Sequence, residues 1–320
     1  MIRFGILGLG NIAHRFARSA QLNPNVTIEM VASSSQAKGE AFCQKYGIRH
    51  YTQDYTQLMD HPAIDAVYIA VPHGRHAVLV EKCLHRHKAV LCEKPLGLNA
   101  AEVSHLMQVA ASEQVFLMEA VKGYFLPARD QLKEVLKQGA IGTPLYLEAN
   151  FDSVVPYQKG KYLFEKGQGG ALLDVGIYPL SFALDMFEGD PVVAQSKLVM
   201  SQGIDTYFQA LLNFADGQSC LLEGSIDRAR PRVALIQGTQ GTLEIPYYYR
   251  CQEFTVTSKG QSQKYESSWH GDDMSGEIQE VVSCLQAGLL ESRLHPLCQS
   301  LKLAQLLDDI RTKAVCFDVG

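Results

Sequence analysis

The sequence predicts an α/β fold class with two domains: a doubly wound parallel sheet, then an α+β domain with an open, mostly antiparallel sheet. Its 320 residues exceed one average domain and suit two cores of roughly 100–200 residues each. Over residues 1–120, apolar strand-like runs alternate with amphipathic helical stretches, whereas strand patterns follow one another directly after that point. We therefore expect one domain at 1–120 and a second at 121–320.

The first domain shows the alternation of a parallel sheet wrapped by helices. Strands are predicted at Ile2–Leu7, Ile28–Ser34, Ala66–Val71, Ala89–Cys92 and Val115–Met118. Helical patterns fill the gaps at Asn11–Gln21, Ala37–Tyr46, His76–His85 and Ala100–Ser112. Asn99, with Glu102 three residues later, is the capping pair expected at the start of the last of these helices.

The second domain is predicted from consecutive strands joined by turns. These strands are Leu145–Phe151, Val192–Met200, Phe208–Phe214, Cys220–Ile226, Val233–Gly238 and Thr242–Ile245. Asp216-Gly217 and Gly238–Gly241 lie between such runs as hairpin turns. Helices at Leu172–Phe187, Met274–Ala287 and Pro296–Lys313 would cover one face of the sheet. The other face is expected to be bare, which predicts a homodimer or a dimer of dimers.

The composition favours a soluble cytoplasmic protein without a nucleic-acid partner. Apolar residues make up 47% and charged residues 20% of the chain. No apolar run approaches the ~20 residues needed to span a bilayer, and no cationic leader precedes an apolar block. The net charge of −5 offers no basic field for nucleic acid. The eight cysteines are scattered without a Cys-x-x-Cys pair, so reduced thiols and no metal site are expected.

The run Gly8-Leu9-Gly10-Asn11-Ile12-Ala13 follows the first predicted strand and opens the first helix. It matches the G-x-G-x-x-(G/A) fingerprint of a Rossmann domain in the required context. Gly8 permits a tight turn, Gly10 lets the backbone approach a pyrophosphate, and Ala13 allows close packing of helix on strand. The helix N-terminus would hold the anion, so a dinucleotide is expected there, with Asn11 and Ile12 beside it. The alternative is a strand–helix turn without a nucleotide.

The end of the second strand bears on the choice of cofactor, because an Asp or Glu there would hold the adenosine ribose and repel a 2′-phosphate. The segment Ala32–Lys38 contains no carboxylate. Ser33, Ser34 and Lys38 are expected to accept a 2′-phosphate, which favours NADP, although the Arg that would make the case firm is missing. NAD stays possible, because the segment also reads as a Ser-rich capping loop that is indifferent to the phosphate.

Two later segments carry candidate catalytic side chains. Glu93-Lys94-Pro95 follow an apolar strand, and a Lys at the carboxyl end of a parallel strand points into the crevice where ligands bind in this architecture. The run Gly169–Leu180 begins a helix with glycines. Asp174 and Tyr178 are four residues apart in it, so they share one face of that helix.

In these motifs the chain resembles the glucose–fructose oxidoreductase and inositol dehydrogenase (Gfo/Idh/MocA) family, and within it the dimeric dihydrodiol dehydrogenase branch. The resemblance covers nearly the whole chain and is carried by the Gly8 fingerprint, Glu93-Lys94-Pro95, Met118-Glu119-Ala120, Gly169–Tyr178 and Glu277–Ser292. It implies that Lys94 and Tyr178 are the catalytic pair and that Asp174 contacts substrate hydroxyls. It also implies a cis peptide at Lys94-Pro95 that swings Lys94 toward the nicotinamide. Other branches place a His where this chain has Tyr178.

The chemistry of these residue types agrees with such a pair. Alcohol oxidation needs a base for the hydroxyl proton, and free Tyr with a pKa of ≈ 10 is a poor base at neutral pH unless a cation lies close. Lys94 supplies that cation, which favours the phenolate of Tyr178 and, in the reverse direction, helps to protonate the carbonyl oxygen. The alternatives are a surface Lys paired with Glu93 and a Tyr that packs on an amphipathic helix.

One segment departs from the resembled branch, whose members usually carry Trp and Arg after Met-Glu-Ala. Here the chain reads Val121-Lys122-Gly123-Tyr124-Phe125-Leu126-Pro127. Lys122 and Tyr124 are therefore expected to bind the substrate in a more polar and more cationic pocket. That change favours sugars, polyols or their acidic derivatives over an aromatic dihydrodiol.

The loop after the third predicted strand offers further contacts to a cofactor. Pro72, His73 and His76 follow that strand, and with Glu93 they are expected to line the cofactor crevice. His76 has an alternative role as a residue that starts a helix.

The sequence thus predicts an NAD(P)-dependent oxidoreductase that transfers a hydride between nicotinamide and a hydroxyl or carbonyl carbon of a sugar, polyol or dihydrodiol-like substrate. The alternative from another class is a non-catalytic dinucleotide sensor of the same fold. The presence of both Lys94 and Tyr178 argues against the sensor.

Overall fold

The computed structural model describes residues 1–319, which form two compact units. The first unit contains residues 1–120 and 270–301, and the second contains residues 121–269 and the chain from residue 302 onward. Residues 270–301 interrupt the second unit in sequence but pack with the first, so the helix expected at Met274–Ala287 packs in the first unit and does not cover the second sheet. Within residues 1–319, no helix is long and apolar enough to cross a membrane.

The first unit is built on a parallel sheet of six strands. In sequence these are β1 (Ile2–Leu7), β2 (Val26–Ala32), β3 (His50–Thr52), β4 (Ala66–Ile69), β5 (Ala89–Glu93) and β6 (Leu117–Ala120). Their order across the sheet is β3-β2-β1-β4-β5-β6. The chain leaves β1 in one direction to build β2 and β3, and later returns to the other side of β1 to build β4. In such a sheet, ligands bind at the carboxyl ends of the strands beside this switch point.

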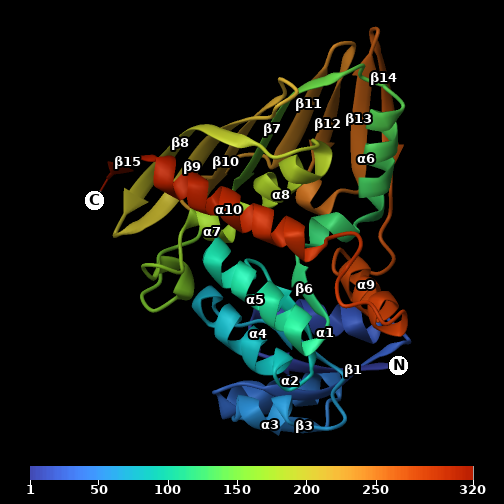
Figure 1. Ribbon diagram of the computed structural model, residues 1–320, viewed down its shortest axis with the longest axis vertical. Coiled ribbons are helices and arrows are strands. Elements are labelled where there is room, and N and C mark those ends of the chain that lie inside the picture. Colours follow the sequence, from blue (N-terminus) through green and yellow to red (C-terminus); the bar gives the residue numbers. More distant parts are fainter. Residues whose placement is uncertain (320) are drawn as a thin grey trace. The chain divides into compact units, whose positions relative to one another are not determined.

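Helical segments pack around the sheet of the first unit, and all but the last of them connect its strands. They are α1 (Asn11–Gln21), α2 (Gln36–Tyr46), α3 (Tyr55–Met59), η1 (His73–Arg75), α4 (His76–Leu84), α5 (Ala100–Glu113) and α9 (Ser275–Gln286). α1 packs on β2, α2 and α9, whereas α4 packs on β4, β5 and α5 (Figure 1). The sequence did not predict β3 or α3, because three and five residues are too few to show a period.

The C-terminal return to the first unit is held by polar contacts to α1. Ser19 donates a hydrogen bond to Asp272 (2.5 Å), and Arg15 forms an ion pair with the buried Asp273. The predicted capping pair at α5 is also present: Asn99 accepts a hydrogen bond from the N–H of Glu102 (2.9 Å). The carboxylate of Glu102 reaches back to the N–H of Leu98 (2.8 Å), one residue before the cap.

The second unit contains a mixed sheet of nine strands. In sequence these are β7 (Pro144–Asp152), β8 (Val192–Ser201), β9 (Ile204–Asn213), β10 (Ser219–Ser225), β11 (Val233–Gly238), β12 (Gly241–Pro246), β13 (Glu253–Ser258), β14 (Gln261–Glu266) and β15 (Val315–Asp318). Their order is β14-β13-β12-β11-β7-β10-β9-β8-β15. The β7–β10 and β8–β15 pairs are parallel and the others antiparallel. These two sheets confirm the predicted fold class.

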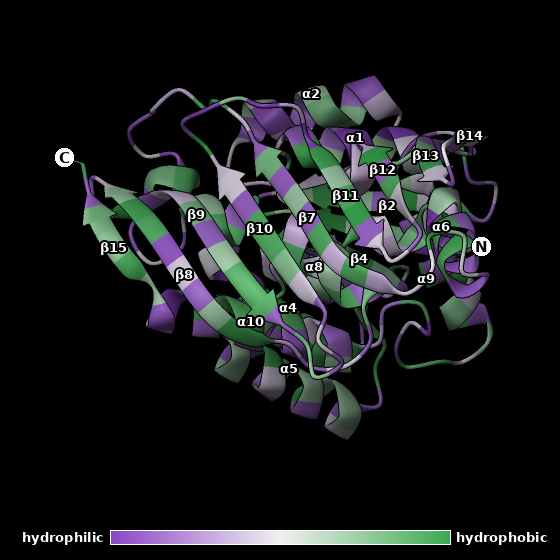
Figure 2. Cartoon of the chain, turned by 90° about the horizontal axis from the view of Figure 1, so that it is seen from above, coloured by the Kyte–Doolittle hydropathy of each residue, from purple (hydrophilic) through white to green (hydrophobic). Residues whose placement is uncertain are grey.

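The remaining helical segments cover one face of this sheet. They are η2 (Lys122–Phe125), α6 (Pro127–Lys137), η3 (Tyr162–Phe164), α7 (Ala171–Asp174), α8 (Ile177–Met186), η4 (Tyr248–Arg250) and α10 (Leu297–Lys313), whose first residues belong to the first unit. Figure 1 shows α7, α8 and α10 in front of the strands. In Figure 2 the opposite face, with β8, β9, β10, β7 and β11, carries no helix of residues 1–319.

The predicted helix Leu172–Phe187 is wrong in one respect, because the structure divides it into α7 and α8. The N–H groups of Val175 and Gly176 both donate to the carbonyl oxygen of Ala171 (2.9 and 3.0 Å), so the helical turn widens and the chain restarts. A Cβ at Gly176 would lie 2.3 Å from the carbonyl oxygen of Leu172. The break therefore depends on glycine at this position.

Candidate functional site

The loop between β1 and α1 has the form of a phosphate cradle. Gly8 has a φ of +88°, and a Cβ there would lie 2.4 Å from the carbonyl oxygen of Ala70, so glycine is required. Gly10 is the N-cap of α1 and has no side chain to bond to the first N–H groups of the helix, and among residues 1–319 no atom beyond its chain neighbours lies within 4 Å of the place where its Cβ would be. Asn11 is exposed and Ala13 is buried. These N–H groups and the open space above Gly10 fit a pyrophosphate.

The serine-rich segment after β2 divides its hydroxyls between two uses. Ser35 caps α2 by accepting a hydrogen bond from the N–H of Lys38, and the buried Ser33 accepts one from the N–H of Ser35 (3.2 Å). Ser34 is exposed and lines a cavity of about 240 Å³. Lys38 is exposed on α2 and does not line this cavity. Local capping thus occupies Ser33 and Ser35, and Ser34 keeps its side chain toward the cavity.

The same cavity is lined by cationic side chains that were not predicted from the sequence. Arg75 and Lys82, from η1 and α4, line it together with Ser34. The guanidinium of Arg75 lies 5.2 Å from the ring centre of Tyr55, and Asp54 at the rim caps α3 by accepting from the N–H of Thr56. Arg75 lies between His73 and His76 in the sequence. Its approach to Ser34 could not be seen there, because it depends on the path of the connection between β4 and α4.

The two histidines of that connection are buried. His73 is 4% exposed and His76 0% exposed, and their ring centres are 5.7 Å apart. His76 is the first residue of α4, as its alternative role as a helix-start residue requires. Its Nδ1 lies 2.7 Å from the carbonyl oxygen of Pro95 and its Nε2 lies 2.8 Å from that of Val71. Pro72 is exposed beside them.

Lys94 follows the last residue of β5 in a turn that is held on several sides. The Lys94-Pro95 peptide is cis, as predicted. The preceding carboxylate, Glu93, accepts a hydrogen bond from the buried hydroxyl of Tyr68 (2.5 Å), and burial is the main reason why the pKa of Tyr68 is raised. After Pro95, the N–H of Leu96 donates to the buried carboxylate of Glu119 (2.9 Å). The backbone around Lys94 is therefore fixed from β4 and β6 as well as from β5.

In the second unit, Asp174 ends α7 and Tyr178 lies in the first turn of α8. Within Ala171–Leu180, these two side chains are the ones that stay partly exposed, while the other eight residues are buried. The Tyr178 ring stacks on Phe151 of β7, with ring centres 4.5 Å apart and planes at 16°, and lies 5.6 Å from Tyr249. The hydroxyl of Tyr162 lies 3.5 Å from Asp174 Oδ1. Asp174 and Tyr178 therefore lie in two successive helices, not on one face of a continuous helix as the spacing predicted, and both stay partly exposed.

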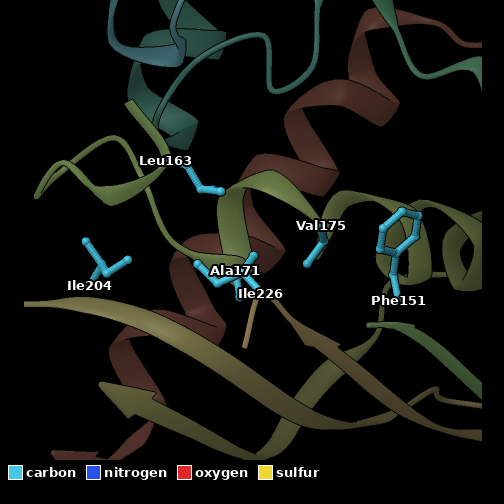
Figure 3. Packing of buried hydrophobic residues seen from close by; sticks show 6 residues of the cluster. All are labelled: Phe151, Leu163, Ala171, Val175, Ile204 and Ile226. Atoms are coloured by element: carbon cyan, nitrogen blue, oxygen red, sulfur yellow. The ribbon is translucent and has the colours of Figure 1, made fainter. Parts of the chain in front are cut away.

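An apolar cluster holds α7 in place. It consists of Phe151, Leu163, Ala171, Val175, Ile204 and Ile226. Figure 3 shows these side chains around the short helix, with Phe151 and Ile204 at the two ends. Tyr178 packs against this cluster as a partly buried residue. The Tyr178 ring is therefore held in position by the apolar cluster.

A partly buried carboxylate completes the support of α7. Asp205 accepts a hydrogen bond from the N–H of Leu172 (2.6 Å). Gly170 has a φ of +101°, and a Cβ there would lie 2.1 Å from Asp205 Oδ1. Burial raises the pKa of Asp205 to about 6, against the lowering effect of the backbone N–H groups.

Lys122 and Tyr124 in η2 lie near the same aromatic group. The Nζ of Lys122 is 5.6 Å from the ring centre of Tyr249. Tyr124 is buried and donates its hydroxyl to the carbonyl oxygen of Ser181 (3.2 Å). Tyr124, Tyr178 and the buried Tyr248 all line a small cavity of about 30 Å³. Lys122 does not line this cavity but places its charge near the Tyr249 ring, whereas Tyr124 contributes its own ring to the cavity wall.

Within residues 1–319, no group of three or more His, Cys, Asp or Glu side chains is arranged to hold a metal ion. The residues that the structure brings together in the first unit are those at the carboxyl ends of β1, β4 and β5. In the second unit, they are the residues around Tyr178 and Tyr249.

Comparisons with known proteins agree with this division. Residues 2–121 match the model of an oxidoreductase family with an NAD-binding Rossmann fold, and residues 130–244 match a GFO/IDH/MocA C-terminal domain. A trans-1,2-dihydrobenzene-1,2-diol dehydrogenase from Mus musculus is 33% identical, over 97% of this chain and 96% of the relative.

Solved structures show the same fold over the full length. A 3-ketoreductase from Actinomadura kijaniata in complex with NADP and TDP-benzene is 24% identical, with a TM-score of 0.93 over 100% of this chain and 99% of that chain. An aldose-aldose oxidoreductase from Caulobacter crescentus complexed with glycerol is 19% identical, with a TM-score of 0.88 over 98% of this chain and 97% of that chain. On its sequence and on its architecture, this chain belongs to the GFO/IDH/MocA family of oxidoreductases.

Proposed function

We propose that this protein is an NADP-dependent oxidoreductase that acts on a CH–OH or carbonyl carbon of a sugar, polyol or dihydrodiol-like substrate. The observation that carries the proposal is the pair Lys94 and Tyr178 in a chain that aligns end to end with dihydrodiol dehydrogenases. Lys94 stands after β5 on a backbone fixed from three strands, and Tyr178 lies on the partly exposed face of α8. The two residues belong to different units.

In the proposed reaction Tyr178 exchanges a proton with the substrate oxygen, and Lys94 favours the phenolate by its charge. When bound, the dinucleotide supplies the acceptor or donor of the hydride. The 3-ketoreductase of known structure has also been crystallised with single Tyr-to-Phe and Lys-to-Ala substitutions. Those two positions are as many residues apart as Lys94 and Tyr178, which supports the same pairing in this chain.

The proposal assigns the phosphate groups of the dinucleotide to two places in the first unit. The pyrophosphate would lie on the N–H groups above Gly10. A 2′-phosphate would lie in the cavity that contains Ser34, where Arg75 and Lys82 add positive charge to a hydroxyl. NADP is therefore favoured over NAD, and Arg75 rather than Lys38 supplies the cation.

The substrate would be held by Asp174 and Lys122. Asp174 can accept hydrogen bonds from a second hydroxyl of the substrate, which suits a sugar or polyol. Lys122, above the ring of Tyr249, would favour a substrate with an acidic group. Tyr124 would shape the wall rather than bind, because its hydroxyl is already used by Ser181.

The uncovered face of the nine-stranded sheet supports a homodimer. Partly exposed apolar residues alternate with buried ones in several strands of this sheet, among them Leu211 of β9, Leu221 of β10 and Leu235 of β11. Charged residues such as Glu223, bonded to Arg230 (2.9 Å), lie among them, and this mixture is typical of a protein interface. Sedimentation of the protein, with Leu221→Arg as the disrupting variant, tests the assembly: a monomeric unmodified protein at micromolar concentration would refute it.

A cytoplasmic location is part of the proposal. All eight cysteines are free thiols, and burial raises the pKa of several of them, including Cys83 and Cys251, to about 12. Unpaired, unreactive thiols are typical of a reducing compartment.

A substrate screen tests the function itself. Sugars, polyols, trans-dihydrodiols and keto sugars are offered with NADP or NADPH, and the nicotinamide absorbance is followed. At least one class should turn over with the unmodified protein and fail with Lys94→Ala. If bound NADPH is never oxidised by any carbonyl compound, the dinucleotide sensor becomes the better description.

A further inference from the structure

One peptide group in the first unit is held at both ends by buried ionisable side chains. It joins Pro95 to Leu96, directly after Lys94. Its carbonyl oxygen lies 2.7 Å from Nδ1 of His76, and its N–H donates to Oε1 of Glu119 at 2.9 Å. His76 is 0% exposed and Glu119 is 2% exposed, so water cannot replace either contact.

The second nitrogen of His76 decides the state of the ring. Nε2 lies 2.8 Å from the carbonyl oxygen of Val71, so both ring nitrogens face atoms that can only accept a hydrogen bond. A neutral imidazole has a single N–H and would leave one nitrogen lone pair against a carbonyl oxygen. Only the imidazolium form has a donor for each of the two carbonyls.

We propose that His76 is protonated on both ring nitrogens and, with the carboxylate of Glu119, forms a pair of opposite charges that acts across the Pro95–Leu96 peptide. The cation lies at the negative end of the peptide dipole and the anion at the positive end. Each therefore strengthens the other's hydrogen bond. His76 and Glu119 are positioning residues, because they fix the backbone that carries Lys94.

The charges around His76 act in both directions. Burial is the largest influence and lowers the pKa of His76, and the nearby Lys94 lowers it further. The two carbonyl oxygens and Glu119 raise it, and the ring of His73 is a close titratable neighbour. Deprotonation would break one of the two short contacts and leave a buried carbonyl unpaired, which costs about as much as a lost charged hydrogen bond.

Glu119 is itself held on its second oxygen. Its Oε2 lies 3.4 Å from Nε2 of the buried His295, and the hydroxyl of Ser300 lies 3.0 Å from the same nitrogen. The arrangement runs from β4 through the turn after β5 to β6 and on to the C-terminal return of the chain. These contacts connect the backbone that carries Lys94 to residues 292–300, which are far away in sequence.

The charge state can be measured without any substrate. Protein labelled with ¹⁵N at histidine, with no cofactor added, is studied by NMR at pH 7, and His76→Gln identifies the signal of His76. We expect both nitrogens of His76 to carry slowly exchanging protons at the shifts of an imidazolium. The exposed His85 is the internal reference for a ring in contact with water. A neutral ring for His76 would overturn the proposal.

The positioning role rests on the proposed catalytic role of Lys94 and is tested by kinetics. His76→Gln and Glu119→Gln should each lower kcat by about 10²-fold, the cost of a misplacement near 1 Å, with little change in the affinity for NADPH. The double variant should be no slower than the worse single one, because both changes release the same peptide. Unchanged kcat in both variants would contradict the positioning role.

A surface pair in the same unit gives the matched control. His85 Nδ1 lies 2.9 Å from Glu113 Oε1, on the exposed ends of α4 and α5. His85→Gln and Glu113→Gln should leave kcat unchanged. If His76→Gln does not fold, Glu119→Gln still tests the kinetics, and loss of the imidazolium signal in that variant tests the charge pair. A chain in which His76 is charged but no substrate turns over would refute the proposed function and leave the charge pair standing.

Discussion

The loop between β1 and α1 and the segment from α7 to α8 both serve the proposed reaction, but they are built in opposite ways. The first works by the absence of side chains: Gly8 lies where a Cβ would strike Ala70, and Gly10 leaves the end of α1 open. The second works by the presence of side chains, because Tyr178 stacks on Phe151 from a distant strand. In the proposed function, the backbone of the loop would recognise the cofactor and the packed side chains would carry the chemistry.

This difference predicts that the two functions can be separated by mutation. A change in the loop should remove dinucleotide binding and leave the aromatic group around Tyr178 intact. A change at Tyr178 should do the reverse.

The largest expected effect is on turnover. Tyr178→Phe should lower kcat by about 10²–10⁴-fold, the usual contribution of general acid–base catalysis, while the dissociation constant for NADPH stays nearly the same. Lys94→Ala should cause similar damage, and the double variant should be little worse, since the two act as a unit. Tyr265→Phe, on the stacked pair with Phe254 in the outer strands, is the control and should have normal kcat.

The glycine loop provides the next effect. Gly8→Ala should abolish measurable NADPH binding and lower the free energy of unfolding by at least about 1–3 kcal/mol, because a positive φ and a clash with a carbonyl oxygen add together. Gly47→Ala is the matched control: Gly47 has a φ of +69° but no atom within 4 Å of its Cβ position. It should cost about 1 kcal/mol and leave binding unchanged. Equal losses in the two variants would remove the steric argument for Gly8.

A smaller effect concerns how α7 is held and depends on pH. Burial raises the pKa of Asp205 from 3.8 to about 6, so the folded protein favours the protonated form. The raised pKa adds at most about 3 kcal/mol to the free energy of unfolding. This contribution is fully present below pH 3.8 and is lost as the pH rises through about 6. Urea unfolding of the unmodified protein and of Asp205→Asn should show a difference that shifts in favour of the variant as the pH rises. If the difference in free energy of unfolding between the two proteins does not vary with pH, the raised pKa of Asp205 is contradicted.

The smallest effect is on the choice of cofactor. Arg75→Ala should weaken NADPH binding by about 10–100-fold, the value of a charge-assisted hydrogen bond, and leave NADH binding unchanged. Ser34→Asp should reverse the preference. Lys38→Ala is the informative control, because Lys38 does not line the cavity. Tighter binding of NADH than NADPH to the unmodified protein would show that the cavity has another use.

The sequence allowed the first unit to be predicted closely because its signals are local. The bounds of β1 and α1 were predicted to the residue, since the glycine fingerprint and the apolar period meet within a few residues. Residues 270–301 could not be assigned to this unit from sequence. Their attachment depends on Ser19 and Arg15, which reach partners far along the chain.

Contacts between distant segments also explain what was missed at the sites. Arg75 lies between His73 and His76 after the third predicted strand, yet it shares a cavity with Ser34, which follows another strand. The break at Gly176 escaped the helical period of Leu172–Phe187, because a bond shared by two N–H groups at Ala171 leaves no mark in the pattern of apolar residues. Asp174 and Tyr178 were predicted to share one face because they are four residues apart. The break lies between them, so they belong to two helices.

The most direct test of the central claim is the transfer of deuterium from the cofactor to a product. NADPH carrying deuterium at the reactive carbon of its nicotinamide is incubated with the unmodified protein and the best carbonyl substrate of the screen, and the product is analysed by mass spectrometry. We predict one deuterium on the new CH–OH carbon, and almost none with Tyr178→Phe in the same time. A protein that binds NADPH tightly but leaves every carbonyl product unlabelled would contradict the account.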